Sequence, residues 1–97
     1  MSCSFHPEAR AELLRAIAYY DDLADGLGTD FAAEVHDTIQ RVVDLPHAWP
    51  EIKSGIRRCM VRRFPFGVVY AELGEDIVVL AVMHLHRRPG YWADRTT

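Results

Sequence analysis

Several side chains capable of chemistry lie close together near the C-terminal end of the sequence. His84, His86, Arg87 and Tyr91 fall within one stretch of eight residues. Histidine and tyrosine can accept or donate protons, and arginine can stabilise negative charge that develops on a phosphate. This stretch is therefore the first candidate for a catalytic site.

The two histidines also have a structural interpretation. Alternation along a strand places His84 and His86 on one face. That face would also carry Val78, Leu80 and Val82. This pattern favours histidines packed at the edge of a sheet. His-x-His could supply two metal ligands, but no third ligand stands at a suitable spacing, so neither a metal site nor another cofactor is predicted.

Four arginines surround a short apolar stretch in the middle of the chain: Arg57, Arg58, Arg62 and Arg63 flank residues 59–61. They could protect an exposed edge strand from pairing with other chains. They could also form bidentate pairs with the carboxylates of a partner segment laid along the sheet. Both interpretations remain open at this point.

An aromatic and cationic cluster follows the Pro89-Gly90 turn. Tyr91 and Trp92 lie between Arg88 and Arg95 in the sequence. Together with Arg87, this cluster could anchor a protein interface. Packing of Trp92 back over the sheet is an equal alternative.

Composition limits the class of protein. The chain has 97 residues, of which 49% are hydrophobic and 26% charged, as expected of one folded domain spanning residues 1–97. Cys3 and Cys59 lie far apart and match no metal spacing, and the N-terminal residues do not resemble a secretory signal, which predicts a cytoplasmic location. No apolar run is long enough to span a membrane.

Charge is distributed unevenly along the chain. Residues 1–52 contain ten acidic and three basic residues, and residues 53–97 contain four acidic and eight basic residues. A solvated acidic helix face accounts for the first half. The arginines of the second half could contact phosphate groups or an acidic protein partner.

A first amphipathic helix is predicted to begin at Pro7, because proline lacks the N–H that a first helical residue leaves unpaired. Apolar residues then recur at spacings of three and four from Ala9 to Ala24. Glu8 and Glu12 lie mainly off this apolar stripe. The helix should therefore bury one face and expose its acidic residues.

A second helix should follow the glycine-containing turn at residues 26–28. Thr29 is expected to cap it, and Leu45 should end it because Pro46 disfavours helical backbone at the preceding residue. Two amphipathic helices joined by a few residues should pair antiparallel and cover another apolar layer.

Strand-like patterns supply that layer. Residues 57–64, 66–73 and 77–85 each have the length and composition of a strand. The last is nearly continuous in apolar residues and should be central, whereas the first is mostly polar and resembles an edge strand. Residues 2–6 could form a short first strand, but they are too few to assign. The sequence predicts an α+β fold, an antiparallel helical hairpin on a small, mainly antiparallel sheet of three or four strands.

Particular residues in this layout resemble the RelE/ParE toxin superfamily over nearly the whole chain. Those of the helical half are Phe5-His6-Pro7-Glu8-Ala9, Glu12-Leu13, Tyr19-Tyr20, Leu27-Gly28, Phe31 and Glu34-Val35. Those of the sheet and tail are Pro46, Trp49, Pro50, Gly55-Ile56-Arg57-Arg58, Phe64-Pro65-Phe66, Tyr70, Ala81-Val82-Met83-His84, Arg87-Arg88-Pro89-Gly90-Tyr91-Trp92 and Arg95.

The resemblance implies a small bacterial toxin of a type II toxin–antitoxin system, of the kind also called plasmid stabilisation proteins, neutralised by a cognate antitoxin. ParE-like members inhibit DNA gyrase by binding, and RelE-like members cleave messenger RNA on the ribosome. The ParE-like activity is the leading hypothesis here, because RelE-like ribonucleases carry several lysines and this chain has only Lys53. Gly67 and Val68 also stand where a RelE-like enzyme would have an arginine.

The resemblance assigns expected roles to the candidate residues. The target-binding set is Arg87, Arg88, Tyr91, Trp92 and Arg95. The antitoxin-binding set is Arg57, Arg58, Arg62 and Arg63. If the chain is a ribonuclease, its catalytic set is His84, His86, Arg87 and Tyr91. An inactive interaction module with the same fold is the second alternative. Neither membrane association nor sequence-specific DNA binding by the toxin alone is expected.

Overall fold

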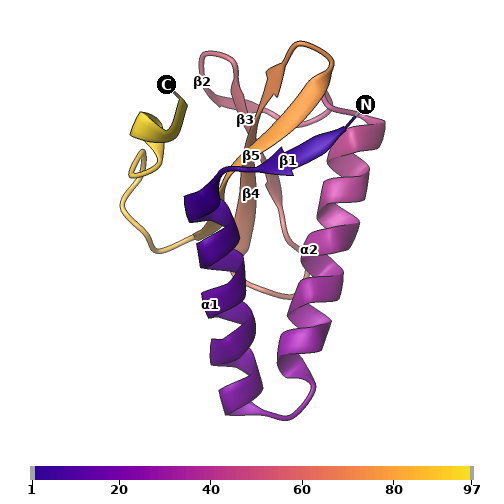
Figure 1. Cartoon of the computed structure of the whole chain (residues 1–97), viewed down its shortest axis with the longest axis vertical. Helices are drawn as coiled ribbons and strands as arrows, with labels where there is room; N and C mark the ends of the chain where they lie inside the picture. The colour runs from indigo at the N-terminus through magenta and orange to yellow at the C-terminus, as the bar shows by residue number, and fades with distance from the viewer. Residues whose placement is uncertain (1, 97) are drawn as a thin grey trace.

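The computed structural model describes residues 2–96, in which two helices lie against one face of a five-stranded sheet (Figure 1). The helices are α1 (Pro7–Leu23) and α2 (Leu27–Asp44). The strands are β1 (Cys3–Phe5), β2 (Glu51–Lys53), β3 (Ile56–Met60), β4 (Phe66–Leu73) and β5 (Asp76–His84), and a short 3-10 helix, η1 (Ala93–Thr96), follows them. The predicted α+β class is confirmed, with more strands than expected.

Helix α1 begins at Pro7, as predicted. The backbone N–H of Glu8 donates to Nδ1 of His6, which caps the helix. Ala9 and Ala16 are buried against the sheet layer. Glu12 is also buried, only 7% exposed, although its position off the apolar stripe predicted an exposed side chain. That prediction was wrong, because the C-terminal residues cover this side of the helix.

Helix α2 begins at Leu27, ahead of the predicted cap at Thr29. The turn is tight because Gly28 lies directly against α1: its N–H donates to Oδ1 of Asp21 at 2.7 Å. A Cβ atom at Gly28 would lie 2.4 Å from the carbonyl oxygen of Ile17. The two helices therefore approach closely at Gly28, and the predicted cap at Thr29 is wrong because the helix has already begun two residues earlier.

The strand order across the sheet is β1-β5-β4-β3-β2. β4 pairs antiparallel with both β3 and β5, and the short β1 pairs parallel with β5. β2, which the sequence did not predict, pairs antiparallel with the outer side of β3. The prediction that the arginine-rich strand forms an edge was therefore wrong. β2 lacks an apolar pattern because all three of its residues are exposed.

A bulge in β5 changes which side chains share a face. The register shifts opposite residues 69–70 and leaves Leu80 as an extra residue. Leu80 and Ala81 both pack on the face away from the helices, whereas Val82 packs in the helix-facing core. Simple alternation along the strand had predicted that Leu80, Val82 and His84 lie on one face of the sheet. This prediction was wrong because the extra residue reverses the alternation beyond it.

The two faces of the sheet carry separate apolar clusters. On the helix side, aromatic rings pack together, with the centroids of Phe31 and Phe66 4.8 Å apart. On the other side, Trp92 covers the sheet and is only 3% exposed. Its buried neighbours there are Ile56, Val69, Leu80, Ala81 and Met83. The C-terminal residues thus cover one face, and the helical hairpin covers the other.

Neither α1 nor α2 combines the length and the apolarity that a membrane-crossing helix needs, and none of residues 2–96 forms such a segment.

Candidate functional site

A buried carboxylate on α1 holds the C-terminal segment, residues 85–96, against the sheet. The side chain of Glu12 is 6% exposed. The hydroxyl of Tyr91 donates to Oε2 of Glu12 at 2.7 Å. The Arg95 guanidinium donates to Oε1 and Oε2 at 3.0 and 3.2 Å. Because the ion pair is also hydrogen-bonded on both oxygens, it can offset much of the cost of removing both charges from water.

The same ion pair completes the hydrogen bonding of β5. β1 pairs with β5 only as far as Val79, because the chain then turns into α1. Beyond that point, the N–H of Val82 donates to Oε1 of Glu12 at 3.1 Å, and Nη1 of Arg95 donates to the carbonyl oxygen of Leu80 at 3.0 Å. Glu12 and Arg95 therefore satisfy backbone groups that a longer β1 would have paired.

This environment changes the acid–base behaviour of the segment. Burial, and then the hydrogen bond to Glu12, raises the pKa of Tyr91 well above its usual value. Burial alone would lower the pKa of Arg95, but its bonds with Glu12 raise that pKa overall. The Arg87 guanidinium stacks 3.8 Å from the centroid of the Tyr91 ring. Tyr91 is therefore held as a protonated donor, a poor state for a general base.

A groove of about 480 Å³ runs beside this network along α1. Tyr19 and Leu23 line it from the helix, and they are 60% and 61% exposed. His84 lines the opposite wall, and Arg15 and Arg87 add positive charge. The groove thus offers exposed apolar surface with cations beside it, the composition of a protein-binding surface.

The predicted catalytic residues lie in different surroundings. The centroid of the His84 ring lies 5.1 Å from the ring centroids of both Phe66 and His86. The backbone N–H of His86 donates a hydrogen bond to Nδ1 of His84. Tyr91 lines a separate polar pocket of about 510 Å³, to which Arg87 also contributes. Among residues 2–96, no group of three or more histidine, cysteine, aspartate or glutamate side chains is placed to hold a metal ion.

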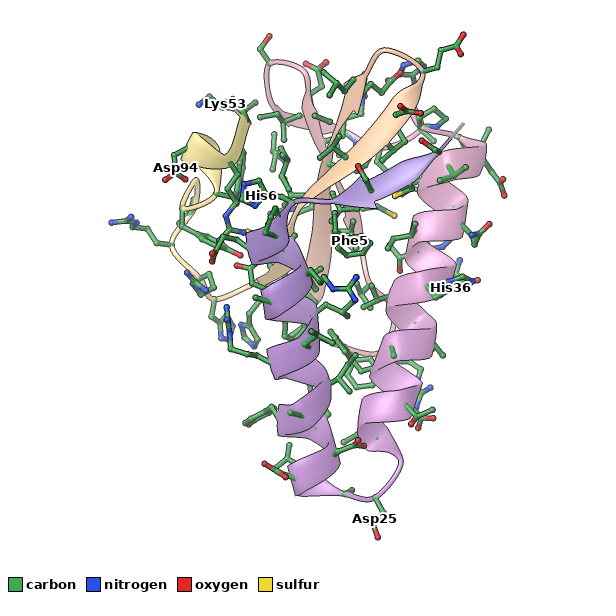
Figure 2. The ribbon with its side chains drawn as sticks, in the orientation of Figure 1. Phe5, His6, Asp25, His36, Lys53 and Asp94 are labelled. Carbon is green, nitrogen blue, oxygen red and sulfur yellow. The ribbon has the colours of Figure 1, made fainter. Side chains whose placement is uncertain are left out.

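The residues of the predicted target-binding set differ in how far they are available to a partner. Trp92 is buried on the sheet, and the Arg95 side chain is 11% exposed. Arg87 is about half exposed, and Arg88 is exposed. Arg88 lines the polar pocket together with His6, whose position at the start of α1 is labelled in Figure 2. Arg87 and Arg88 are thus the members of the set that a partner can reach.

The four arginines of the predicted antitoxin-binding set do not share one strand. Arg57 and Arg58 lie in β3, whereas Arg62 and Arg63 lie beyond its end. The Nη1 of Arg57 donates to the carbonyl oxygen of Trp49 at 2.6 Å.

The other two arginines, Arg62 and Arg63, lie in the loop after β3 and form ion pairs with acidic residues of α2. Arg63 lies 3.3 Å from Glu34 and 3.7 Å from Asp30, and Arg62 lies 3.9 Å from Asp37. The acidic and basic halves of the sequence therefore meet within the molecule.

Comparison with known proteins identifies the family. The family model described as "ParE toxin of type II toxin-antitoxin system, parDE" matches residues 3–89. The chain belongs to the ParE toxin family. Its fold is similar to that of a solved structure titled "Chromosomal ParDE TA system from P. aeruginosa", with a TM-score of 0.78 and 18% sequence identity over 89% of this chain and 97% of that chain. A search of curated protein sequences finds no match.

Membership of the ParE family confirms the predicted superfamily and makes the chain a toxin of a type II system. Glu12, the residue that holds the C-terminal segment, could not be recognised from the sequence. Glu12 lies within a stretch quoted for the resemblance, but helical periodicity indicated exposure. Its main partner, Arg95, is distant in sequence, so no local pattern could have revealed the pair.

Proposed function

We propose that this ParE-family toxin acts by binding and inhibiting DNA gyrase in the bacterial cytoplasm, without catalysing a reaction, and that a cognate antitoxin neutralises it. The hydrogen bond from Tyr91 to buried Glu12 carries the non-catalytic part of the proposal. It occupies the hydroxyl that a RelE-like mechanism would use, and the raised pKa of Tyr91 keeps that hydroxyl protonated.

The target-binding surface in this proposal is the cationic end formed by Arg87 and Arg88. Both are exposed beside the polar pocket, and Arg87 is held in place by stacking on Tyr91 and by its position 3.9 Å from Glu12. Trp92 and Arg95 both help to hold Tyr91, on which Arg87 stacks: Tyr91 packs against the cluster that contains Trp92, and Arg95 lies 5.0 Å from its ring centroid. Positively charged side chains fixed in this way favour fast, specific association with an acidic protein surface.

The antitoxin surface in this proposal includes the groove along α1. An amphipathic helix could place apolar side chains between Tyr19 and His84 and acidic side chains near Arg15 and Arg87. An extended part of the antitoxin would continue onto the sheet. Co-expression with the small protein encoded next to the toxin gene should yield a complex that co-purifies.

One pair of assays tests the activity. Purified toxin is added to DNA gyrase in a supercoiling reaction and, separately, to ribosomes carrying messenger RNA. We expect loss of supercoiling and intact messenger RNA. Cleaved messenger RNA without an effect on gyrase would refute the proposal in favour of the ribonuclease, with His84, His86, Arg87 and Tyr91 as the residues to test.

Induction in cells separates an active toxin from an inactive module. We expect growth arrest that co-expression of the antitoxin relieves. The variant Arg87→Ala/Arg88→Ala should be folded by circular dichroism and should lose most of its toxicity. Normal growth despite good expression of the unmodified chain would favour the inactive interaction module.

A further inference from the structure

A cavity on the sheet face away from the helices has features of a second binding site. It has a volume of about 350 Å³ and lies between β2, β3, the end of β5 and the C-terminal segment. We infer that it binds an extended acidic segment of the antitoxin, with one large apolar side chain in the cavity and a carboxylate beside Lys53 and Arg58. This inference rests on the proposed function for the identity of the partner.

The cations at this cavity are available for a partner. Arg57, Arg62 and Arg63 each lie near a carboxylate of the chain. By contrast, neither Lys53 nor Arg58 has a carboxylate at ion-pair distance anywhere in residues 2–96. Figure 2 shows Lys53 near η1, the helix that follows Trp92. Two unpaired cations at one cavity favour an acidic ligand.

The wall of the cavity contains a buried donor without an acceptor. Trp92 lines the cavity, is 3% exposed and has no hydrogen-bond partner for its Nε1–H among residues 2–96. A buried N–H without an acceptor is costly and uncommon in folded proteins. Because this N–H is closed to solvent, a bound segment affects it through the side chains packed around it, and its signal therefore reports on the cavity.

Gly67 of β4 makes room for one of the cations. It pairs with Met60 on one side and Met83 on the other. A Cβ atom at Gly67 would lie 2.9 Å from Cδ of Arg58, so the arginine stem lies across the glycine. Arg58 therefore lies above Gly67 and lines the cavity.

The surroundings favour an extended segment. β2 is the last strand of the sheet, so its outer edge has no neighbouring strand in the described part of the chain. An extended peptide can pair with such an edge and direct alternate side chains toward the cavity. Ile52 and Met60 are 36% and 44% exposed on this side and add apolar contact area for the peptide.

The first test measures binding of the co-purified antitoxin to toxin variants. Arg58→Gln removes the charge and keeps most of the stem over Gly67. The matched control is Arg10→Gln, because Arg10 is exposed on α1 and has no ion pair within residues 2–96. We expect Arg58→Gln to weaken binding about tenfold and the control to change it by less than about twofold. Equal affinities of the two variants would overturn the inference.

The second test examines the cavity without the antitoxin. The probe is N-acetyl-Leu-Glu-Leu-amide, and its control is the same peptide with Gln in place of Glu. The indole N–H signal of Trp92 is followed by nuclear magnetic resonance in the Trp49→Phe variant, which leaves Trp92 as the only tryptophan. We expect the Glu peptide to shift this signal with saturation, the Gln peptide to bind several times more weakly, and Arg58→Gln to remove the difference.

The two tests separate the possible failures. If the unmodified toxin does not bind the antitoxin but the Glu peptide shifts Trp92, the proposed partner is wrong and the cavity is still an acidic-peptide site. If the antitoxin binds equally well to both variants and the peptide leaves Trp92 unchanged, the cavity inference is wrong and the proposed toxin function stands. Concentration-dependent self-association that Arg58→Gln abolishes would instead assign the cavity to a second copy of the chain.

Discussion

The two faces of the sheet are covered by different means. The helix side is closed by two long amphipathic helices that pack on the sheet through a cluster of buried apolar side chains. The other side is covered by the C-terminal segment, which contributes Trp92 and is held by hydrogen bonds to Glu12. Apolar burial is spread over many side chains, whereas the second attachment depends on one carboxylate. The first should determine global stability, and the second should determine the geometry of the cationic surface.

The largest expected loss of stability comes from a substitution in the core on the helix side of the sheet. Phe31 is fully buried among aromatic rings, so Phe31→Ala should lower the free energy of unfolding by about 4 kcal/mol. Trp92→Ala removes a larger side chain but should cost less globally, because the C-terminal segment can detach while the helices and sheet stay folded. Urea denaturation followed by circular dichroism measures both variants. Equal losses would show that the two faces unfold as one unit.

The next largest loss of stability is expected when the attachment of the C-terminal segment is removed. Glu12→Ala leaves Arg95 without its counter-ion and the N–H of Val82 without an acceptor, and we expect a loss of about 3 kcal/mol. Glu8→Ala, at an exposed position of the same helix, should cost only about 0.5 kcal/mol. The urea midpoints of the two variants test this difference. Similar midpoints would mean that Glu12 contributes no more than a surface carboxylate.

A pH titration compares tyrosines on the two sides. Burial raises the pKa of Tyr70, which contacts the helix-side cluster, to about 12, and the pKa of Tyr91 is also raised. Unfolded tyrosine ionises near pH 10, so the stability due to these groups is present below about pH 10 and is lost as the pH rises toward 12.

Denaturation midpoints measured over this range should therefore fall. Tyr70→Phe and Tyr91→Phe should each make the fall less steep, because each removes one ionising group. A midpoint that stays constant between about pH 10 and about pH 12 would contradict the burial of both hydroxyls.

The smallest effect concerns the ion pairs between the loop after β3 and α2. Arg63→Ala should change stability by less than about 1 kcal/mol, because Arg63, Asp30 and much of the surrounding surface are exposed to water. Raising the salt concentration should reduce even this difference. A larger loss would mean that these ion pairs stabilise the fold more than exposed pairs usually do.

Much of the architecture could be predicted from local patterns. Helical periodicity indicated both helices, and β-branched and aromatic runs indicated β3, β4 and β5. β1 lies within residues 2–6, which were considered as a short first strand but were too few to assign, and β2 was missed because a three-residue segment with no buried residue carries too little pattern. The reversed facing of Leu80 could not be predicted, since a bulge depends on pairing with β4.

The candidate site was predictable only as a set of residues near each other in the sequence. Arg87 lines two pockets, one of which it shares with His84 and the other with Tyr91, so His84 and Tyr91 do not line one common pocket. The sequence by itself determined the two-layer α+β fold and the ParE family, because periodicity and residue order are properties of the chain alone. Only the tertiary structure decided that Glu12 is buried, that Arg95 completes the hydrogen bonding of β5, and that Arg58 and Lys53 have no carboxylate at ion-pair distance within residues 2–96. Those roles depend on charges and backbone groups brought together from distant positions, and sequence spacing contains no record of that proximity.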